Sequence, residues 1–270
     1  RRYAETSPQR LPTLQEKLKN DTYQPQPVQR VWIPKPGSKE LRPLGISPVE
    51  DRVVQMALRN VIEPVFENVF AEHSYGFRPG RGAKTALARV VELLGKGKCW
   101  VVDADIKGYF DNIPQEPLLA AISEHISDGK VLELIRQFLE QGVMESGKPW
   151  QPTETGTPQG AVISPLLANI YLNPLDHLMA QKGREMVRYA DDFVILCESQ
   201  QEAEETLAEV RQWMEKAGLT LHPTKTCIVH ERDRGGFDFL GYHFERGYKW
   251  PRRKSLEKFK ETIRHKPPRL

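Results

Sequence analysis

Two adjacent aspartates, Asp191 and Asp192, lie between apolar residues in the C-terminal half of the chain. Residues 186–196 are apolar on both sides of this pair, which predicts two strands joined by a tight acidic turn. Neighbouring carboxylates repel each other and a turn needs at most one Asp, so a bound divalent cation is one explanation of the pair. Ordinary turn residues are the alternative. A third carboxylate, Asp105, ends an apolar run that begins at Trp100 and is typical of a buried strand.

Three carboxylates on neighbouring strands suit one kind of chemistry. Mg²⁺ takes oxygen ligands, usually one or two carboxylates completed by phosphate oxygens and water, and Mn²⁺ is an alternative ion. A site built from Asp105, Asp191 and Asp192 would hold two ions ~3.5–4 Å apart, the arrangement for in-line phosphoryl transfer. The sequence therefore predicts a metal-dependent phosphoryl-transfer site.

The elements around these residues predict an α+β fold with helices packed on an antiparallel sheet. Extended segments are expected at 28–33, 100–106 and 186–196, and at two strands within 227–244 that are joined by Gly235-Gly236. Asp111 or Asn112 is expected to cap the helix that begins near Pro114. Helical spacing covers 11–20, 49–70 with Pro64 as an interruption, 83–94, 114–127, 130–141, 164–181 and 202–217.

Composition limits the class of protein. The 270 residues are 39% apolar and 28% charged, enough to bury a core in one large domain or two coupled subdomains. No apolar run approaches the ~20 residues of a membrane span, and residues 1–4 offer no signal region, so we expect an intracellular protein without a membrane partner. Three cysteines without paired spacing predict reduced core thiols.

Positive charge is concentrated at one end. The net charge is +3, but residues 246–270 alone contribute +8, from ten Lys or Arg against two acids. Three aromatic residues, Tyr248, Trp250 and Phe259, lie between these charges. This composition suits a nucleic-acid backbone with stackable bases, and a solvated surface helix is the alternative.

Several segments together resemble one known family. Tyr189-Ala190-Asp191-Asp192 is similar to the YxDD box of reverse transcriptases, and residues 104–111 around Asp105 resemble their first palm motif. Residues 156–169, 218–225 and 239–242 resemble further palm motifs. Residues 33–46 and 75–79 are similar to the fingers of the group II intron branch. The matches run in the family's order from about residue 28 to 245, which makes coincidence implausible where two adjacent Asp alone would be a weak signal.

The resemblance implies a catalytic role for the acids. Asp105 and Asp191 would hold both ions, Asp192 would support the ion at the primer end, and the Ile106 carbonyl would be a further ligand. Phe110 resembles the ring that excludes a ribose 2′-hydroxyl and so selects deoxynucleotides, with a core aromatic as the alternative.

Other residues would hold the substrates. Lys35 and Arg42 resemble the fingers residues that close on the incoming triphosphate, although either could be a solvated charge. Gln159 is expected to touch the nucleotide or template through its amide, and Gly160 to let the backbone approach closely. Lys225 resembles the residue that protonates or neutralises the pyrophosphate leaving group, with a surface lysine as the alternative. Primer or template contacts are expected from Tyr189, Arg78, Leu240 and Gly241, the last two as a primer-gripping hairpin.

The implied architecture is that of a right-hand polymerase with fingers and palm, and with the thumb absent or only begun. Residues 1–98 would form the fingers, with part of the palm from about 45, and 99–245 the palm, with 114–160 partly returning to the fingers. Residues 246–270 would be the basic start of a thumb or linker. The missing thumb and the start at Arg1 without Met favour an excised catalytic core over a compact relative.

The expected function is RNA-directed DNA synthesis for group II intron mobility, in a bacterial cytoplasm or an organelle. The partners would be an RNA template, a DNA primer, dNTPs and intron RNA; the oligomeric state is open, a dimer included. One alternative is a splicing maturase that binds intron RNA with catalysis secondary. Another is an RNA-copying RNA polymerase, against which Phe110 and Ala190 both argue.

Overall fold

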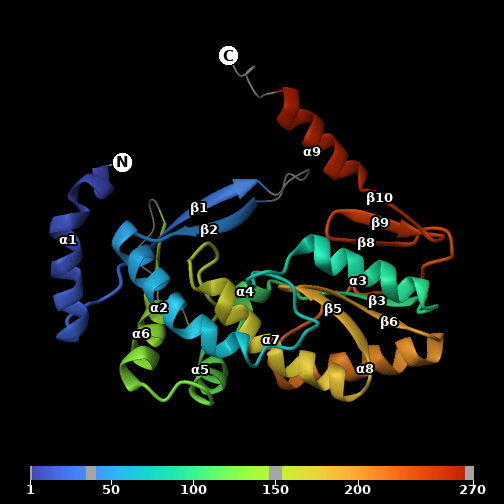
Figure 1. The fold of residues 1–270 in the computed structure, drawn as a ribbon, viewed down its shortest axis with the longest axis horizontal. Coiled ribbons are helices and arrows are strands. Elements are labelled where there is room, and N and C mark those ends of the chain that lie inside the picture. Colours follow the sequence, from blue (N-terminus) through green and yellow to red (C-terminus); the bar gives the residue numbers. More distant parts are fainter. Residues whose placement is uncertain (1, 35–40, 146–153, 265–270) are drawn as a thin grey trace. The chain divides into compact units, whose positions relative to one another are not determined.

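The computed structural model describes residues 2–34, 41–145 and 154–264, which form two compact units (Figure 1). The first unit consists of Arg1–Val69 and Phe110–Ile170, and the second of Phe70–Tyr109 and Tyr171–Leu270. Each unit is therefore built from two separate stretches of chain. Residues 70–98, which fall where the sequence analysis expects fingers with part of the palm, belong to the second unit, because the helix within them packs on that unit's sheet.

Helices make up most of the first unit. They are α1 (Arg2–Lys19), α2 (Val49–Glu67), α4 (Tyr109–Asn112), α5 (Gln115–Ser123), α6 (Gly129–Glu140) and the start of α7 (Ser164–Gln181). Buried apolar side chains come mainly from α2, α5 and α6, among them Leu58, Ile62, Phe66, Leu118, Ile122 and Phe138. A three-stranded sheet completes the unit, with β1 (Val28–Pro34) between antiparallel β2 (Leu41–Ile46) and parallel β4 (Val143–Met144).

A four-stranded antiparallel sheet forms the centre of the second unit. Its strand order is β5 (Glu185–Tyr189), β6 (Asp192–Cys197), β3 (Trp100–Asp105) and β7 (Cys227–His230). The two central strands carry an almost unbroken apolar run because both faces of the sheet are covered (Figure 1).

Helix α3 (Ala83–Gly95) covers one face of this sheet and α8 (Gln200–Lys216) the other. Alternate residues divide between the faces: Val101, Val194 and Leu196 join one core cluster with Val90 of α3. On the opposite face the Cys197 thiol lies 3.9 Å from the Thr206 hydroxyl of α8. The N-terminus of α8 is capped by Ser199, whose hydroxyl accepts a hydrogen bond from the Glu202 amide.

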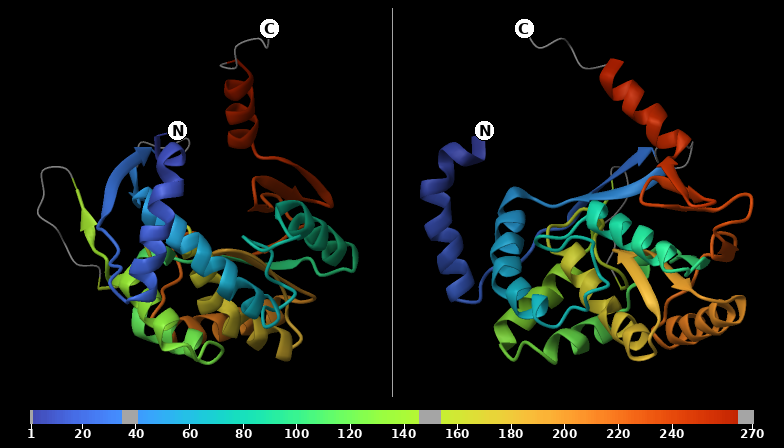
Figure 2. Two further views of the ribbon diagram at one scale, coloured as in Figure 1. Left: turned by 60° about the vertical axis from the view of Figure 1, so that its left-hand side comes forward. Right: turned by 45° about the vertical axis from the view of Figure 1, so that its right-hand side comes forward.

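A second, smaller sheet covers part of the α3 side. It contains β8 (Phe237–Phe239), β9 (Tyr242–Glu245) and β10 (Tyr248–Pro251), all antiparallel, and Phe237, Phe239 and Phe244 join the core cluster. Helix α9 (Arg253–Arg264) follows and buries none of its side chains. It projects away from this sheet in both views of Figure 2.

The expected α+β class is confirmed, and most of the helices and strands lie where the sequence predicts them. Two helix boundaries were wrong: α1 begins at Arg2 instead of residue 11, and α2 passes Pro64 without interruption. Ile62 and Phe66 are buried on either side of Pro64, so their packing outweighs the backbone hydrogen bond that proline removes.

Local turn chemistry misled the sequence analysis at two places. The Gly235-Gly236 turn does not join a hairpin, because β7 pairs with β3 whereas β8 pairs with β9. The helix α5 has Pro114 as its N-cap and no side-chain cap, since Asp111 and Asn112 already lie within α4.

Two of the three cysteines, Cys99 and Cys197, are buried as expected, but Cys227 is exposed. None of the helices in the described part of the chain is both long enough and apolar enough to cross a membrane.

Candidate active site

The paired aspartates occupy the tip of the β5–β6 hairpin. Tyr189 and Asp192 are Cα partners across the hairpin, so Ala190 and Asp191 make a two-residue turn. Ala190 has φ +59, in the left-handed region that a residue with a Cβ enters at a cost. The hairpin predicted from the sequence is confirmed, and the turn displays Asp191 at its tip.

Asp105 lies directly opposite the hairpin. It ends β3, and its Cα partner on β6 is Asp192, so the two side chains share one face of the sheet. The end of β3 is pinned from its other side: the Lys107 amide donates to the Thr220 carbonyl (2.8 Å), and the His222 amide donates to the Asp105 carbonyl (2.7 Å). Backbone pairing alone therefore positions Asp105 beside the hairpin, and no loop is needed to bring it there.

Asp103 is a fourth acid on the same face, for which the sequence analysis proposed no role in the site. It lies two residues before Asp105 on β3, and alternation turns both side chains the same way. The signal that would have found it is the spacing of two acids by two positions in an apolar strand.

The site holds more negative charge than its surroundings neutralise. Removal from bulk water, followed by the charges of Asp191 and Asp105, raises the pKa of Asp192 to about 7. Removal from water and then the Asp192 charge raise the pKa of Asp103 to about 7 as well. Burial also raises the pKa of Asp191. Among the described residues, one of these acids forms a salt bridge with a lysine: Lys225 Nζ lies 3.0 Å from Asp105 Oδ2, and both side chains are exposed.

The carboxylates fit a hard divalent cation in part. Oxygen-only donors of this kind are what Mg²⁺ and Mn²⁺ prefer, and mutual repulsion of the acids is relieved by a cation. No group of three or more His, Cys, Asp or Glu residues among those described is arranged to enclose an ion by itself. Because Mg²⁺ is usually held by one or two carboxylates plus phosphate oxygens and water, a site completed by substrate accounts for both observations.

A buried ion pair supports the hairpin from below. Arg188, on β5, is fully buried and makes a bidentate contact with Asp176 of α7, with Nε–Oδ1 at 2.7 Å and Nη2–Oδ2 at 2.5 Å. The same guanidinium donates to the Ala190 carbonyl (2.8 Å) and the Ser74 hydroxyl (2.8 Å). It therefore ties the strained turn to a helix and to a neighbouring loop.

That loop, residues 70–82, lies along β5. The Tyr75 amide donates to the Arg188 carbonyl (2.8 Å), and the Arg188 amide donates to the His73 carbonyl (2.9 Å). Gly76 lies so close to the hairpin that a Cβ there would be 2.5 Å from the Ala190 nitrogen. A glycine is therefore required at this contact.

Arg78, for which a primer or template contact is predicted, is turned toward the protein. Its side chain is 7% exposed, and Nη1 donates to the carbonyls of Ala71 (2.7 Å) and Ser74 (3.0 Å). The guanidinium also lies 5.1 Å from the centre of the Phe70 ring. These contacts hold the loop in shape and favour a structural role for Arg78; the template contact stays a prediction.

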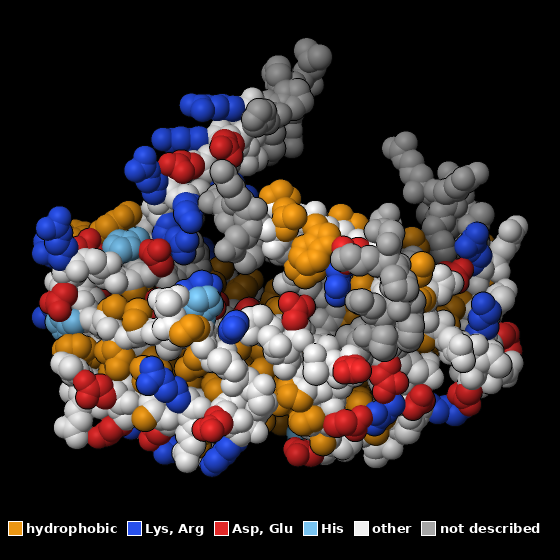
Figure 3. Space-filling view, turned by 180° about the vertical axis from the view of Figure 1, so that it is seen from behind, with side chains coloured by type: hydrophobic (Ala, Val, Ile, Leu, Met, Phe, Trp, Pro, Cys, Tyr) orange, Lys and Arg blue, Asp and Glu red, His pale blue; other side chains and the backbone are white. Residues whose placement is uncertain are grey.

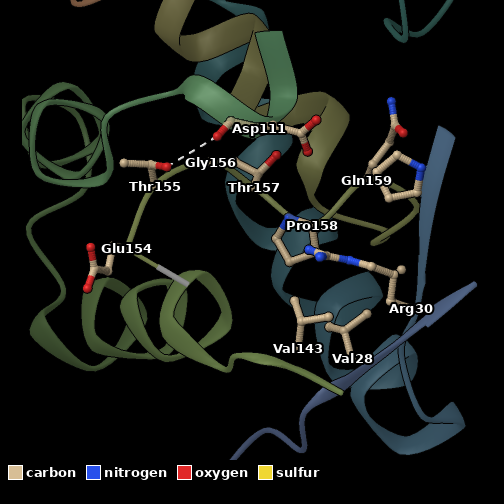
Figure 4. A pocket seen from close by; sticks show the side chains of 12 residues that line it. Val28, Arg30, Asp111, Val143, Glu154, Thr155, Gly156, Thr157, Pro158 and Gln159 are labelled. Carbon is tan, nitrogen blue, oxygen red and sulfur yellow. Dashed lines mark hydrogen bonds between the residues drawn. The ribbon is translucent and has the colours of Figure 1, made fainter. Parts of the chain in front are cut away.

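Three of the nucleotide-binding residues predicted near the fingers, Arg42, Phe110 and Gln159, lie in the first unit. Lys35 falls outside the described residues, and Arg42 is paired with Ile33 through the β1–β2 backbone. The backbone carbonyl of Gln159 accepts a hydrogen bond from the Gly45 amide (2.7 Å). Gln159 lines a pocket of about 380 Å³ together with Arg30, Asp111 and residues 154–158 (Figure 4).

Phe110 is half-buried and is tied to the same segment. Its carbonyl accepts from the Thr157 amide (2.7 Å), and Gly156, at φ +83, allows a close approach in which a Cβ would lie 2.6 Å from that carbonyl oxygen. Gly160 permits a close backbone approach within the unit, where a Cβ would lie 2.7 Å from the Gly45 carbonyl oxygen; the approach to a nucleotide expected of it stays a prediction.

Comparison with known proteins decides the family. The profile of the family described as Reverse transcriptase (RNA-dependent DNA polymerase) matches residues 33–244. The chain belongs to the reverse transcriptase family. Its relatives place it in the group II intron branch. It is 45% identical over 177 residues to the group II intron-encoded protein LtrA of Lactococcus lactis subsp. cremoris, covering 65% of this chain and 29% of that protein.

Two further relatives are longer matches. Protein YkfC of Escherichia coli (strain K12) is 34% identical over 275 residues, covering 87% of this chain and 71% of that protein. Nuclear intron maturase 2, mitochondrial, of Arabidopsis thaliana is 26% identical, covering 79% and 34%. This reverse transcriptase chain thus spans about a third or less of the Lactococcus and Arabidopsis proteins.

A solved structure agrees on the fold alone. Apo telomerase from Candida tropicalis, truncated from its C-terminal domain, superposes with a TM-score of 0.63 at 14% identity, covering 83% of this chain and 55% of that one. The four-stranded sheet of the second unit is accordingly the palm sheet of this reverse transcriptase.

The turn expected to grip the primer is formed in the reverse transcriptase as a tight hairpin. Leu240 and Gly241 join β8 to β9 with φ +46 and +83, the two left-handed residues of a type I′ turn. The Gly241 carbonyl accepts from the Arg252 amide (2.9 Å) and the Ser255 hydroxyl (3.1 Å). The turn therefore anchors the beginning of α9, whose Lys and Arg side chains stand exposed along the helix (Figure 3).

Proposed function

We propose that this chain is the catalytic core of an RNA-directed DNA polymerase that extends a DNA primer on an RNA template with dNTPs and Mg²⁺, for group II intron mobility. The observation that carries the proposal is the pairing of Asp105 with Asp192 beside the Asp191 turn, at one end of the palm sheet. Family membership and the names of the intron-encoded relatives support it. Such a protein works where its intron RNA is, in a bacterial cytoplasm or an organelle.

Asp105, Asp191 and Asp192 hold the ions, with the Ile106 carbonyl as a further ligand. Bound divalent ions would neutralise the triphosphate and activate the primer hydroxyl for in-line displacement. Lys225 neutralises Asp105 in the ion-free chain and stands ready to offer its ammonium to the pyrophosphate. Tyr189, Leu240 and Gly241 contact the primer end of the duplex.

Four further residues would bind the nucleotide. Lys35 and Arg42 contact its triphosphate, and the Gln159 amide contacts its base or the template. Phe110 excludes the ribose 2′-hydroxyl, so dNTPs are preferred to NTPs.

Primer extension tests the proposal directly. The chain is given a DNA primer on an RNA template with Mg²⁺, and dNTPs are compared with NTPs; extension is expected with dNTPs, and it should stop when EDTA is added and resume with Mg²⁺ or Mn²⁺. Asp191→Asn is the matched variant, because it keeps the shape of the side chain and removes the charge that the cations need. Absence of extension by the wild-type chain on any primed RNA, or normal extension by Asp191→Asn, would refute the assignment.

A second function, intron-RNA binding in splicing, is favoured by the maturase among the relatives. It predicts that Asp191→Asn retains binding to intron RNA although it extends no primer. Equal affinity for intron RNA and for an unrelated RNA of the same length would count against it.

A further inference from the structure

Phe77 combines two unfavourable features. Its backbone has φ +58, in the left-handed region, and its aromatic side chain is 48% exposed. A left-handed conformation is costly for a residue with a Cβ, and an exposed ring loses the gain of burial. Features of this kind persist where the surrounding structure enforces them, and they occur preferentially at functional positions.

The loop around Phe77 is firmly held. The next residue, Arg78, is buried against the carbonyls of Ala71 and Ser74, and the preceding Gly76 touches the backbone of Ala190. Phe77 is therefore a fixed aromatic group that the loop presents to solvent, in contrast to a side chain at a mobile loop tip.

The Phe77 ring lies next to a second aromatic ring, that of Tyr189. The Phe77 and Tyr189 ring centres are 5.9 Å apart, with the planes tilted by 45°. Tyr189 ends β5 two residues before Asp191, so the two rings form an aromatic pair next to the acidic turn. Tyr189 is partly buried and packs against the core of the unit, so Phe77 is the exposed ring of the pair. An exposed aromatic ring beside a phosphoryl-transfer site suits the faces of bases and the apolar edges of sugars, which stack on rings irrespective of sequence.

We propose that Phe77, together with Tyr189, forms a platform that binds the terminal base pairs of the primer–template duplex beside the catalytic aspartates. The proposal rests on the proposed polymerase function. It assigns to Phe77 a sequence-independent contact through the ring, distinct from the phosphate contacts that basic residues make.

Duplex binding in the absence of dNTPs and divalent ions tests this separately from catalysis. The affinity of a fluorescent RNA/DNA primer–template is measured by anisotropy at several low salt concentrations for the wild type, Phe77→Ala, Phe77→Trp and Val91→Ala. Val91 is the matched control, since it is 41% exposed in the same unit on α3. Loss of one stacking contact should weaken binding by Phe77→Ala about 5- to 150-fold, whereas Phe77→Trp and Val91→Ala stay close to wild type.

The salt dependence separates a ring contact from a charge effect. Because no phosphate contact is lost, log affinity against log salt should shift downward for Phe77→Ala with its slope unchanged. A benzoylphenylalanine in place of Phe77 should photo-cross-link to the labelled duplex, and one in place of Val91 should not.

A second variant, Phe77→Gly, separates loss of duplex binding from loss of stability. Glycine adopts φ +58 freely, so this variant should unfold at the same or higher urea concentration and yet bind the duplex as weakly as Phe77→Ala. Normal affinity of the folded Ala and Gly variants would overturn the inference while leaving polymerase function intact. So would a cross-link to protein in preference to the duplex. If the wild type neither binds the duplex nor extends primers, the proposed function fails and this inference with it.

Discussion

The buried ion pair of Arg188 and Asp176 leads to a prediction in which substitutions affect stability and activity differently. Both side chains are fully buried, with two charged contacts of 2.5 and 2.7 Å between them. Asp176→Ala would leave a guanidinium buried without its counter-charge, which costs about 3–5 kcal/mol. That is a large share of the roughly 5–15 kcal/mol that keeps a domain folded.

Removing both charges should restore much of the stability. In Asp176→Leu/Arg188→Met, apolar side chains replace the pair, a change that is often close to neutral. The Ala190 carbonyl nevertheless loses its donor at 2.8 Å, and hydrogen bonds to charged groups contribute about 1.5–3 kcal/mol. We therefore expect the double variant to be folded but to hold the Asp191 turn loosely, and to extend primers much more slowly than wild type.

Urea unfolding followed by circular dichroism, and single-turnover primer extension, measure the two effects. The control is Glu185→Ala, which breaks the Arg89–Glu185 contact of 2.8 Å on the same strand; that pair is partly exposed, so its loss should cost at most about 1 kcal/mol. A loss for Asp176→Ala as small as that of the control would refute the argument on stability. Full extension by the double variant would refute the role of Arg188 in positioning the turn.

Four further changes follow from the same structure. Gly76→Ala should place a Cβ 2.5 Å from the Ala190 nitrogen, and so lower both the urea midpoint and the extension rate, whereas Gly95→Ala, where nothing lies within 4 Å, should not. Phe110→Val should raise ribonucleotide incorporation relative to dNTPs; an unchanged ratio in a folded variant would make Phe110 a core aromatic. Deleting residues 252–270 should flatten the salt dependence of duplex binding by several units of slope, unless α9 is merely a solvated helix. Asp191→Asn should abolish extension and raise the free energy of unfolding by about 0.5–2 kcal/mol.

The acidic hairpin could be predicted because its signals are local. Apolar residues flank Asp191 and Asp192 over a few positions on each side, and the run from Trp100 to Asp105 is equally compact. Each strand can therefore be recognised from its own residues. Because both are apolar along their length, both are expected to pair as central strands of a buried sheet.

Non-local contacts account for what the sequence analysis missed. Arg188 stands in an apolar strand, which hints at a buried partner, but Asp176 and Ser74 lie 12 and 114 residues away. Arg78 is a different case: the resemblance implies a contact with primer or template, whereas the fold turns the side chain inward onto backbone carbonyls. The position of β7 beside β3 likewise depends on a free sheet edge rather than on the Gly235-Gly236 turn.

The expected stabilisation by Asp191→Asn follows from how the second unit treats its buried charges. Asp176 is fully buried and has a guanidinium at 2.5 Å, while no Lys or Arg among the described residues forms a salt bridge with Asp191 or Asp192. Burial raises the pKa of Asp191, and the Asp105 charge raises it further, so the ionised carboxylate destabilises the ion-free fold. An amide of the same shape removes that repulsion, which is why urea unfolding without divalent ions should show a gain for Asp191→Asn, with Asp233→Asn, at an exposed position, as the control. Added Mg²⁺ should then stabilise the wild type more than the variant, since only the wild type keeps the full set of carboxylates. A variant that is less stable than wild type in EDTA would mean that Asp191 is held by contacts within the protein, and the argument that its charge is reserved for a cation would fail.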